Sequence, residues 1–432
     1  MRSIFAAVLL LGACSPAPVA PPPPPRDWPA PSALPARPEL PDPLVTFDGK
    51  KISSRAEWEG ERKPELKALF QHYMYGILPP VGEVTGTVRR TDPAAFGGKA
   101  TLREVSLTIA GPKGPKVDLL FVIPNKRSGT VPVFVGLNFS GNHSLVTDSA
   151  VALPTSWMRG SGKSDEVVNN RATEKGRGKA VGTWALEQSI DRGYAVATVY
   201  YGDIFPDKPD FSDGVYPQFH TPKEGQKSPG DTGCGAIAMW AWGIHRIIDY
   251  LVTQPELDKS RIAVTGHSRL GKTALLAAAF DERIALAIPH QAGCGGTAPS
   301  RTKNPKAETV KRINDSFPHW FDDHFKQFNN DVDRLPFDQH CLLAICAPRP
   351  VLYTNGVEDQ WANPDGQFEM VKAAAPVYRF YGIDALSAAE MPPLGKLVDS
   401  TLGYYIRTGP HVSDPDYWKT FLDYADKHLG KP

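Results

Sequence analysis

Three groups of residues in this chain have the types and the order that acyl transfer by a serine requires. Ser268 lies in the stretch VTGHSRLGK, and His411 follows YYIRTGP near the end of the chain. Between them, the adjacent acids Glu358 and Asp359 follow the run PVLYTNG. A serine hydroxyl attacks a carbonyl carbon when a histidine takes its proton, and that histidine needs a carboxylate that holds its tautomer and stabilises its charge.

The segment around Ser268 predicts a strand, a sharp turn and a helix. RIAVTG before it is rich in β-branched residues, and LGKTALLAAAF after it has the composition of a helix. This is the context of a nucleophile elbow, in which the serine sits at the turn. The general motif has glycine two residues after the serine, whereas here that position is Leu270 and the glycine is Gly271. The segment alone leaves two interpretations open, a nucleophile or a serine that caps a helix.

The acid and the histidine lie at boundaries that suit the same chemistry. The two acids stand at the carboxyl end of a predicted strand, and His411 lies in a loop before the last helix, YWKTFLDYADKHL. His428 lies inside that helix, where we expect a surface residue. Adjacent side chains point apart, so only one of Glu358 and Asp359 can face His411. Each of these residues could instead cap a helix or bond to a loop, but their order after Ser268 favours a triad.

The elements that would position these residues alternate in a way that indicates the fold class. Hydrophobic patterning predicts a helix, then strands, then strands alternating with helices: a helix at 55–76, alternating strands at 83–90, 100–111 and 116–124, apolar strands at 131–139, 194–203, 261–268, 284–293 and 350–359, and helices at 234–254 and 273–281. Continuous apolar strands separated by helices are typical of a parallel sheet covered on both faces. We therefore expect an α/β fold of the α/β-hydrolase type, with a mostly parallel central sheet, antiparallel N-terminal strands and helices on both faces.

The first 45 residues have the composition of an export signal and a linker. MRSIFAAVLLLGACSPAP has a basic Arg2, an apolar stretch too short to span a membrane, and small residues before Cys14. The run LGAC resembles the lipobox of bacterial lipoproteins, with an ordinary cleaved signal as the alternative, and Ser15 favours the outer membrane by the same resemblance. We expect a signal peptide at 1–14, a stiff proline-rich linker at 15–45 and one catalytic domain at 46–432.

Composition and charge exclude several classes of protein. The chain has 432 residues, 41% of them hydrophobic, and a formal net charge of +1, which is ordinary for a globular protein. This balance gives no basic field for nucleic acid. No CxxC or His/Cys cluster occurs, so no metal or other cofactor is expected. Beyond Cys14 there are four cysteines, whose pairing the sequence does not decide: Cys234, Cys294, Cys341 and Cys346.

The motif GHSRLGK, at residues 266–272, resembles the GCSRxGK motif of the glucuronoyl esterases, carbohydrate esterase family 15, which also has the later glycine. Between residues 50 and 430, further stretches resemble bacterial members in the same order: GCGGTAPSR, ETVKRIND, FPHWF, LPFDQH, APRPV, EDQWANPDGQF and GYYIRTGPH. The resemblance implies hydrolysis of the ester between 4-O-methyl-glucuronic acid on xylan and an alcohol on lignin.

The resemblance also implies roles for residues around the serine. The backbone N–H of Arg269 would belong to the oxyanion hole, and its guanidinium would help to hold the oxyanion. Lys272, four residues after Ser268, would face the same pocket and bond to sugar hydroxyls. Three further positions match an acid for a sugar hydroxyl, a tryptophan near the uronate and an aromatic wall of the pocket: Glu308, Trp320 and Trp361. Without the resemblance, a solvated lysine and core tryptophans are the simpler interpretations.

Two positions depart from the family's pattern. His267 stands where fungal members have a cysteine that joins a disulfide, so that bridge is not expected here. Some members have a catalytic glutamate after the strand that follows the elbow, but here that strand ends IPHQAG, without an acid. The acid must then come from the later strand. We choose Asp359 over Glu358 because members with an acid there use the position directly before the Gln-Trp pair.

Two other functions are compatible with parts of this pattern. An acetylxylan deacetylase or another carbohydrate deacetylase could use the same triad, and a carbohydrate-binding surface lipoprotein could lack turnover. Arg269, Lys272 and Glu308 suit a charged sugar better than an acetyl group, and a complete triad argues against a protein that only binds. We expect a monomeric, exported esterase that acts on glucuronoxylan and lignin–carbohydrate esters. It would be held at the outer membrane by lipid on Cys14, or otherwise secreted.

Overall fold

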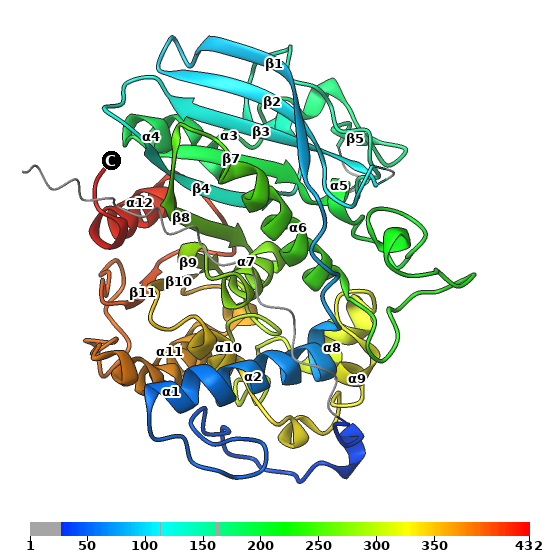
Figure 1. Cartoon of the computed structure of the whole chain (residues 1–432), viewed down its shortest axis with the longest axis vertical. Helices are drawn as coiled ribbons and strands as arrows, with labels where there is room; N and C mark the ends of the chain where they lie inside the picture. The colour runs from blue at the N-terminus through cyan, green and yellow to red at the C-terminus, as the bar shows by residue number, and fades with distance from the viewer. Residues whose placement is uncertain (1–26, 113, 161, 163) are drawn as a thin grey trace, which may run out of the picture.

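The computed structural model describes residues 27–432 except 113, 161 and 163. The predicted signal peptide with Cys14 and the first part of the predicted linker therefore lie outside the described residues. The centre of the molecule is a nine-stranded sheet with the order β1-β2-β3-β7-β4-β8-β9-β10-β11 (Figure 1). Its strands are β1 Thr85–Ala95, β2 Ala100–Thr108, β3 Lys116–Pro124, β4 Val131–Asn138, β7 Ala195–Tyr200, β8 Leu257–His267, β9 Ile284–His290, β10 Val351–Gly356 and β11 Leu402–Arg407.

Strand direction divides the sheet into two parts. The strands from β1 through β3 to β7 pair antiparallel, whereas β7, β4, β8, β9, β10 and β11 pair parallel. A separate ribbon pairs β5 Val167–Val168 with β6 Arg171–Ala172. The predicted α/β-hydrolase layout, with antiparallel N-terminal strands and a mostly parallel sheet, is confirmed.

Helices cover both faces of the sheet. The helices are α1 Arg55–Glu57, α2 Lys63–Phe70, α3 Val181–Trp184, α4 Leu186–Asp191, α5 Tyr201–Ile204, α6 Ala236–Leu251, α7 Arg269–Phe280, α8 Val310–Ser316, α9 Asp323–Lys326, α10 Gln339–Ile345, α11 Pro364–Tyr378 and α12 Pro415–Leu429. Val133 and Val135 of β4 pack in the same core as α6 and α7, while Phe134 between them packs in a second core with α4 and α12. Side chains alternate across a strand, so β4 is apolar on both faces and belongs at the centre.

Two elements near the C-terminus were not predicted. β11 pairs parallel with β10 and leads directly into the loop that holds His411, whereas we expected only a loop there. The run YYIR is too short to stand out as a strand in the sequence. The helix α11 contains Gly366 and Pro376, two residues that weaken a helical pattern. In both cases the packing against β10 outweighs a weak local preference.

The described part of the predicted linker lies against the domain. The Tyr73 hydroxyl donates to the Pro29 carbonyl at 2.7 Å, and the ring of His340 bonds to the Pro41 carbonyl at 2.7 Å through Nε2. Both partners belong to helical segments of the domain, the first to the continuous helical stretch over 55–75. From residue 27 onward the segment therefore packs on the domain and is not a free spacer.

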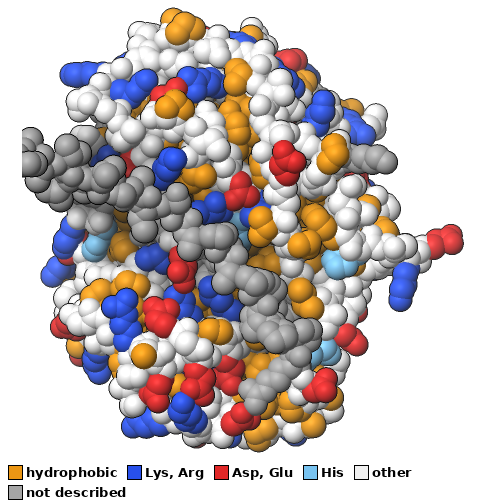
Figure 2. All heavy atoms as spheres, viewed as in Figure 1, with side chains coloured by type: hydrophobic (Ala, Val, Ile, Leu, Met, Phe, Trp, Pro, Cys, Tyr) orange, Lys and Arg blue, Asp and Glu red, His pale blue; other side chains and the backbone are white. Residues whose placement is uncertain are grey.

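The surface carries mixed charge. On the face drawn in Figure 2, basic and acidic side chains are interspersed with apolar ones, so no broad field of one sign covers this face. No helix among the described residues is long and apolar enough to cross a membrane. The four cysteines of the domain are buried and unpaired: Cys234, Cys294, Cys341 and Cys346.

Candidate active site

Ser268 stands between the carboxyl end of β8 and the first residue of α7. Its backbone has φ 59° and ψ −124°, a conformation that residues other than glycine rarely adopt. Its N–H donates to the His290 carbonyl at 2.9 Å, and its own carbonyl accepts from the N–H of Gly271 at 2.9 Å. The hydroxyl makes no capping bond to α7. The turn thus has the backbone of a nucleophile elbow, and its serine side chain is not used as a helix cap.

Two glycines explain why the general motif fails by one position. A Cβ on Gly266 would lie 2.1 Å from the Leu270 carbonyl oxygen. A Cβ on Gly271 would lie 2.9 Å from the carbonyl oxygens of both Gly266 and His290. Leu270, at the usual glycine position, is buried in the core. The helix and the strands therefore approach most closely at Gly271, and that is where a side chain cannot fit.

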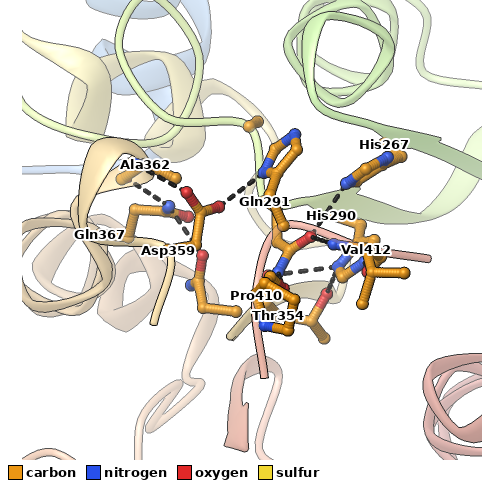
Figure 3. A network of polar contacts seen from close by, with 12 residues as sticks. His267, His290, Gln291, Thr354, Asp359, Ala362, Gln367, Pro410 and Val412 are labelled. Atoms are coloured by element: carbon orange, nitrogen blue, oxygen red, sulfur yellow. Dashed lines mark hydrogen bonds and ion pairs between the residues drawn. The ribbon is translucent and has the colours of Figure 1, made fainter. Parts of the chain in front are cut away.

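His411 is paired with one of the two competing acids. Its Nδ1 lies 2.6 Å from Asp359 Oδ2, and the two side chains are 40% and 4% exposed. Asp359 also accepts from the Ala362 N–H at 3.3 Å through Oδ1, as the cap of a short 3₁₀ turn (Figure 3). Glu358 is exposed. A proton on Nδ1 that is donated to Asp359 leaves Nε2 of His411 free to act as a base.

Gln291 holds the backbone on both sides of His411. Its amide nitrogen donates to the Pro410 carbonyl at 3.0 Å, and its amide oxygen accepts from the Val412 N–H at 2.9 Å (Figure 3). These two partners fix the orientation of the amide, so His267 must donate to the same oxygen from Nε2, at 2.9 Å. One side chain at the end of β9 therefore fixes a loop 120 residues further along the chain.

The buried His290 and the partly exposed His267 lie beside His411. The ring of His267 is 4.3 Å from that of His411 and 4.9 Å from that of His290. His290 donates to the Val412 carbonyl from Nε2, 2.9 Å away, and accepts from the Thr354 hydroxyl at 2.7 Å (Figure 3). Burial lowers the pKa of His290 to about 4 and the pKa of His267 well below its usual value. Both rings are therefore neutral, which avoids a second cation beside His411 when it accepts a proton.

Arg269 is held by an acid that was not among the predicted site residues. Its Nη1 forms an ion pair with Asp207, which lies in the loop after α5. The guanidinium carbon lies 4.8 Å from the centre of the Trp320 ring, 5.5 Å from that of Phe317 and 5.7 Å from that of Phe139. The side chain is 21% exposed. Arg269 is thus enclosed by three aromatic rings and a buried carboxylate, next to the serine.

Asp207 collects donors from several elements. His319 Nε2 and Trp320 Nε1 each lie 2.8 Å from its Oδ1, and the Tyr201 hydroxyl donates to Oδ2 at 3.2 Å. Burial alone would raise the pKa of Asp207, but the bonds from His319, Arg269 and Trp320 hold it below its usual range. Trp320 is itself buried, so its indole N–H serves Asp207 and only its ring lies beside Arg269.

Lys272 and Glu308 are buried charges that support each other. Lys272 donates to the Ala292 carbonyl from the first turn of α7. Burial lowers the pKa of Lys272 and raises the pKa of Glu308, and in each case the charge of the other group opposes the shift. Two coupled, buried groups of opposite charge near a strained serine are typical of a functional site. The solvated lysine considered for the sequence is not what the structure has.

Trp361 lies at the exposed rim of this region. It is 48% exposed, and the Arg312 guanidinium lies 5.6 Å from the ring centre. Its carbonyl accepts from the Glu308 N–H at 3.0 Å, which joins the rim to the buried pair. An exposed aromatic ring beside buried polar groups can stack on the apolar face of a ligand.

The structure separates the remaining candidates from the cluster and adds residues that were missed. His428 bonds to the Asp399 carbonyl at 3.0 Å in α12 and takes no part in the site. Asp207 lies in the loop after α5, seven residues beyond the carboxyl end of β7, and this place near a strand end is the signal that could have indicated it. In the sequence, Gln291 was noted only because a glutamine stands in a segment where some family members have an acid. Within residues 27–432 as described, no group of three or more His, Cys, Asp or Glu side chains could hold a metal ion.

Comparisons with known proteins show which proteins this chain is similar to. The family model described as "Glucuronyl esterase, fungi" matches residues 228–382, which include Ser268 and Asp359. The 4-O-methyl-glucuronoyl methylesterase 1 of Wolfiporia cocos is 29% identical over 354 residues, which cover 80% of this chain and 72% of that protein.

Two solved structures are similar over nearly the whole chain. A promiscuous CE15 esterase from a marine bacterial metagenome has a TM-score of 0.83 and 43% identity, covering 92% of this chain and 98% of its own. The glucuronoyl esterase from Solibacter usitatus has a TM-score of 0.82 and 34% identity, covering 92% of this chain and 100% of its own.

Proposed function

Because the chain belongs to carbohydrate esterase family 15, the family of the glucuronoyl esterases, we propose that it hydrolyses the ester between 4-O-methyl-D-glucuronic acid of glucuronoxylan and lignin alcohols. The observation that carries this proposal is one constellation. The strained Ser268 turn, the pair of His411 and Asp359, and the enclosed Arg269 lie together at the carboxyl edge of the parallel sheet. No cofactor is needed for this chemistry.

The first half of the reaction forms an acyl-enzyme. Ser268 Oγ attacks the ester carbonyl carbon while His411 Nε2 takes the hydroxyl proton, and Asp359 stabilises the imidazolium. The carbonyl oxygen becomes an oxyanion that the backbone N–H and the guanidinium of Arg269 stabilise. When the intermediate collapses, the bond to the alcohol oxygen breaks, and His411 returns the proton to the leaving alcohol.

The second half releases the acid. A water molecule attacks the acyl carbon while His411 again takes a proton, and the bond to Ser268 Oγ breaks as that oxygen regains a proton. The products are the free serine and a uronic acid, which is ionised at neutral pH.

The sugar side of the site is assigned to the buried pair and the aromatic residues. We propose that Lys272 and Glu308 bond to hydroxyls of the uronate ring, since both side chains are buried polar groups and the charge of each favours the charged form of the other. Trp361 would stack on the sugar from the exposed rim, and Trp320 would border the uronate through its ring. A buried polar pair that finds hydroxyl partners only in the correct substrate gives strong discrimination against substrates that lack them.

The decisive experiment is a comparison of substrates. The purified protein should hydrolyse methyl or benzyl D-glucuronate with a far higher kcat/KM than an acetylated xylooligosaccharide. The Ser268→Ala protein is the control for background hydrolysis. A preference for the acetylated sugar would make the enzyme a deacetylase, and binding of either compound without turnover would make it a carbohydrate-binding protein.

We also propose that the protein is exported as a monomer and held at the outer membrane by lipid on Cys14. The support is the lipobox-like run and the proline-rich stretch behind it, both of which lie in residues outside those that the structure describes. Intact-mass analysis of membrane-fraction protein should show a lipidated Cys14, and an unmodified N-terminus beyond residue 14 would contradict this. Sedimentation of the domain should give the mass of one chain.

A further inference from the structure

The guanidinium of Arg269 has its donors unequally available. Nη1 is engaged by Asp207, and Nε is buried without a hydrogen-bond partner among the described residues. Nη2 also has no hydrogen-bond partner in the described part of the chain, but unlike Nε it is not fully buried. The aromatic rings of Phe139, Phe317 and Trp320 lie within 6 Å of the guanidinium carbon. Nη2 is therefore the nitrogen that a ligand can reach.

This arrangement bears on the difference between substrate and product. A carboxylate binds a guanidinium best through two parallel N–H···O bonds along one edge. One edge of Arg269 contains Nη1, which Asp207 occupies, and the other contains Nε, which no ligand atom reaches. A single oxyanion needs one such donor, whereas a carboxylate product has two oxygens to satisfy.

We propose that Asp207 makes Arg269 selective for the oxyanion of the intermediate over the carboxylate of the product, and so limits inhibition by the released uronate. This inference rests on the proposed function, because it requires that hydrolysis turns a neutral ester into an anion beside Arg269. Asp207 is a positioning residue here, since it acts only through Arg269. Without it, the strongest ligand of the free arginine would be the product of the reaction.

The charge of the cluster supports the same conclusion. Asp207 stays ionised because its donors hold its pKa low, while burial lowers the pKa of His319 and keeps that ring neutral. The positive charge of Arg269 is thus compensated by one permanent negative charge. The site keeps a directed donor for the oxyanion, but it has little net charge to attract an anionic product from a distance.

A neighbouring acid provides a matched control. Asp203 lies four residues earlier and is also buried, but its hydrogen bonds come from the Ser156 hydroxyl and the Asp118 N–H, whereas the ion pair of Arg269 is with Asp207. Burial raises the pKa of Asp203 to about 7, so an asparagine there resembles a form that the protein already populates. Asp203→Asn therefore removes a buried carboxylate nearby without changing the partner of the arginine.

The test compares the inhibition constant of free D-glucuronate with the KM of methyl D-glucuronate. In Asp207→Asn the ratio of Ki to KM should fall by about tenfold or more, because an uncompensated guanidinium binds carboxylate more tightly. In Asp203→Asn the ratio should stay within about twofold of the wild type. An unchanged ratio in Asp207→Asn, even with a lower kcat, would overturn the proposal, since a merely structural role would weaken both ligands alike.

A second measurement does not depend on the folding of the Asp207 variant. In the full chain carrying Ser268→Ala, calorimetry should show that D-glucuronate binds no more tightly than its methyl ester. Binding of the acid more than about tenfold tighter than the ester would refute the proposal. If the wild type hydrolyses no glucuronate ester at all, the proposed function fails and this inference with it. Hydrolysis with tight product binding would refute only the inference.

Discussion

On each side of Ser268 a buried aspartate pairs with a basic side chain, but the two basic side chains differ in their exposure. On one side, a buried Asp359 holds the imidazole of His411, whose side chain is 40% exposed. On the other, a buried Asp207 holds the guanidinium of Arg269, which three aromatic rings enclose. Both aspartates are nearly inaccessible to solvent, so each acts on the reaction only through the basic side chain that it contacts.

The difference in exposure follows from the role of each basic side chain. His411 takes up and releases a proton twice in every turnover, so its Nε2 must be reached by the serine, the leaving alcohol and water. Arg269 keeps its proton at every working pH and supplies only a fixed charge, which is most effective where water is excluded. A proton carrier thus stays open, while a fixed electrostatic group is enclosed and compensated.

Removing Oγ of Ser268, which lies between the two pairs, should have the largest effect on kcat. Ser268→Ala leaves both aspartate pairs intact but removes the nucleophile, so kcat on a glucuronate ester should fall by on the order of 10⁶. Steady-state kinetics and circular dichroism measure the activity and the fold. Retention of more than a few per cent of the activity in a folded variant would show that Ser268 is not the nucleophile.

The proton-carrying side should respond strongly to a change that preserves shape. Asp359→Asn places an amide against Nδ1 of His411 and favours the tautomer with the proton on Nε2, which cannot accept the serine proton. A loss in kcat of up to about 10⁴ is expected. The exposed neighbour is the matched control, and Glu358→Gln should change kcat little. A severe loss in Glu358→Gln with a mild one in Asp359→Asn would reverse the assignment.

Changes in the loop that holds His411 should have the next largest effect on kcat. Gln291→Ala removes the bonds to the Pro410 carbonyl and the Val412 N–H, so His411 loses its fixed position. Misplacement of a catalytic group by about 1 Å costs roughly 10²-fold, and we expect a loss of that order in kcat with little change in KM. A variant that is less stable but keeps its kcat would show that Gln291 stabilises the fold and does not position His411.

The smallest effect concerns the neutral histidines beneath His411. Burial lowers the folded-state pKa of His290 to about 4 and that of His267 well below its usual value, so at these two histidines the unfolded chain binds more protons than the folded one below pH 6.5. Their contribution to stability is present above about pH 6.5 and is lost as the pH falls towards 4; for His290 it is at most roughly 3 kcal/mol. Three acids with raised pKa values oppose this loss: Asp203, Glu308 and Asp322.

Urea unfolding between pH 7 and 4 measures this dependence. His267→Gln is the informative variant, because a glutamine can still donate to Gln291 but does not titrate. It should lose less stability than the wild type over that pH range. An identical pH dependence in the two proteins would show that His267 does not contribute to it.

Much of the fold and of the reacting triad could be predicted from the sequence. The apolar strands from β4 to β10 were recognisable because strands buried on both faces are continuously apolar. The order of Ser268, an acid and His411 indicated a triad, since each residue lies at the end of a predicted strand or before a helix. The short β11 and the helix α11 with its internal proline were missed, because their local patterns are weak.

The sequence by itself determined the residue types, their order and the turn that holds Ser268, because these depend on neighbours along the chain. Only the tertiary structure decided which acid faces His411, which acid holds Arg269, and that Gln291 spans the loop at residues 410–412. The partners Asp207 and Arg269 are 62 residues apart, and Gln291 and Val412 are 121 apart. Local preferences do not specify such contacts. They form because a parallel sheet brings the carboxyl ends of separate strands to one edge, where their loops pack together.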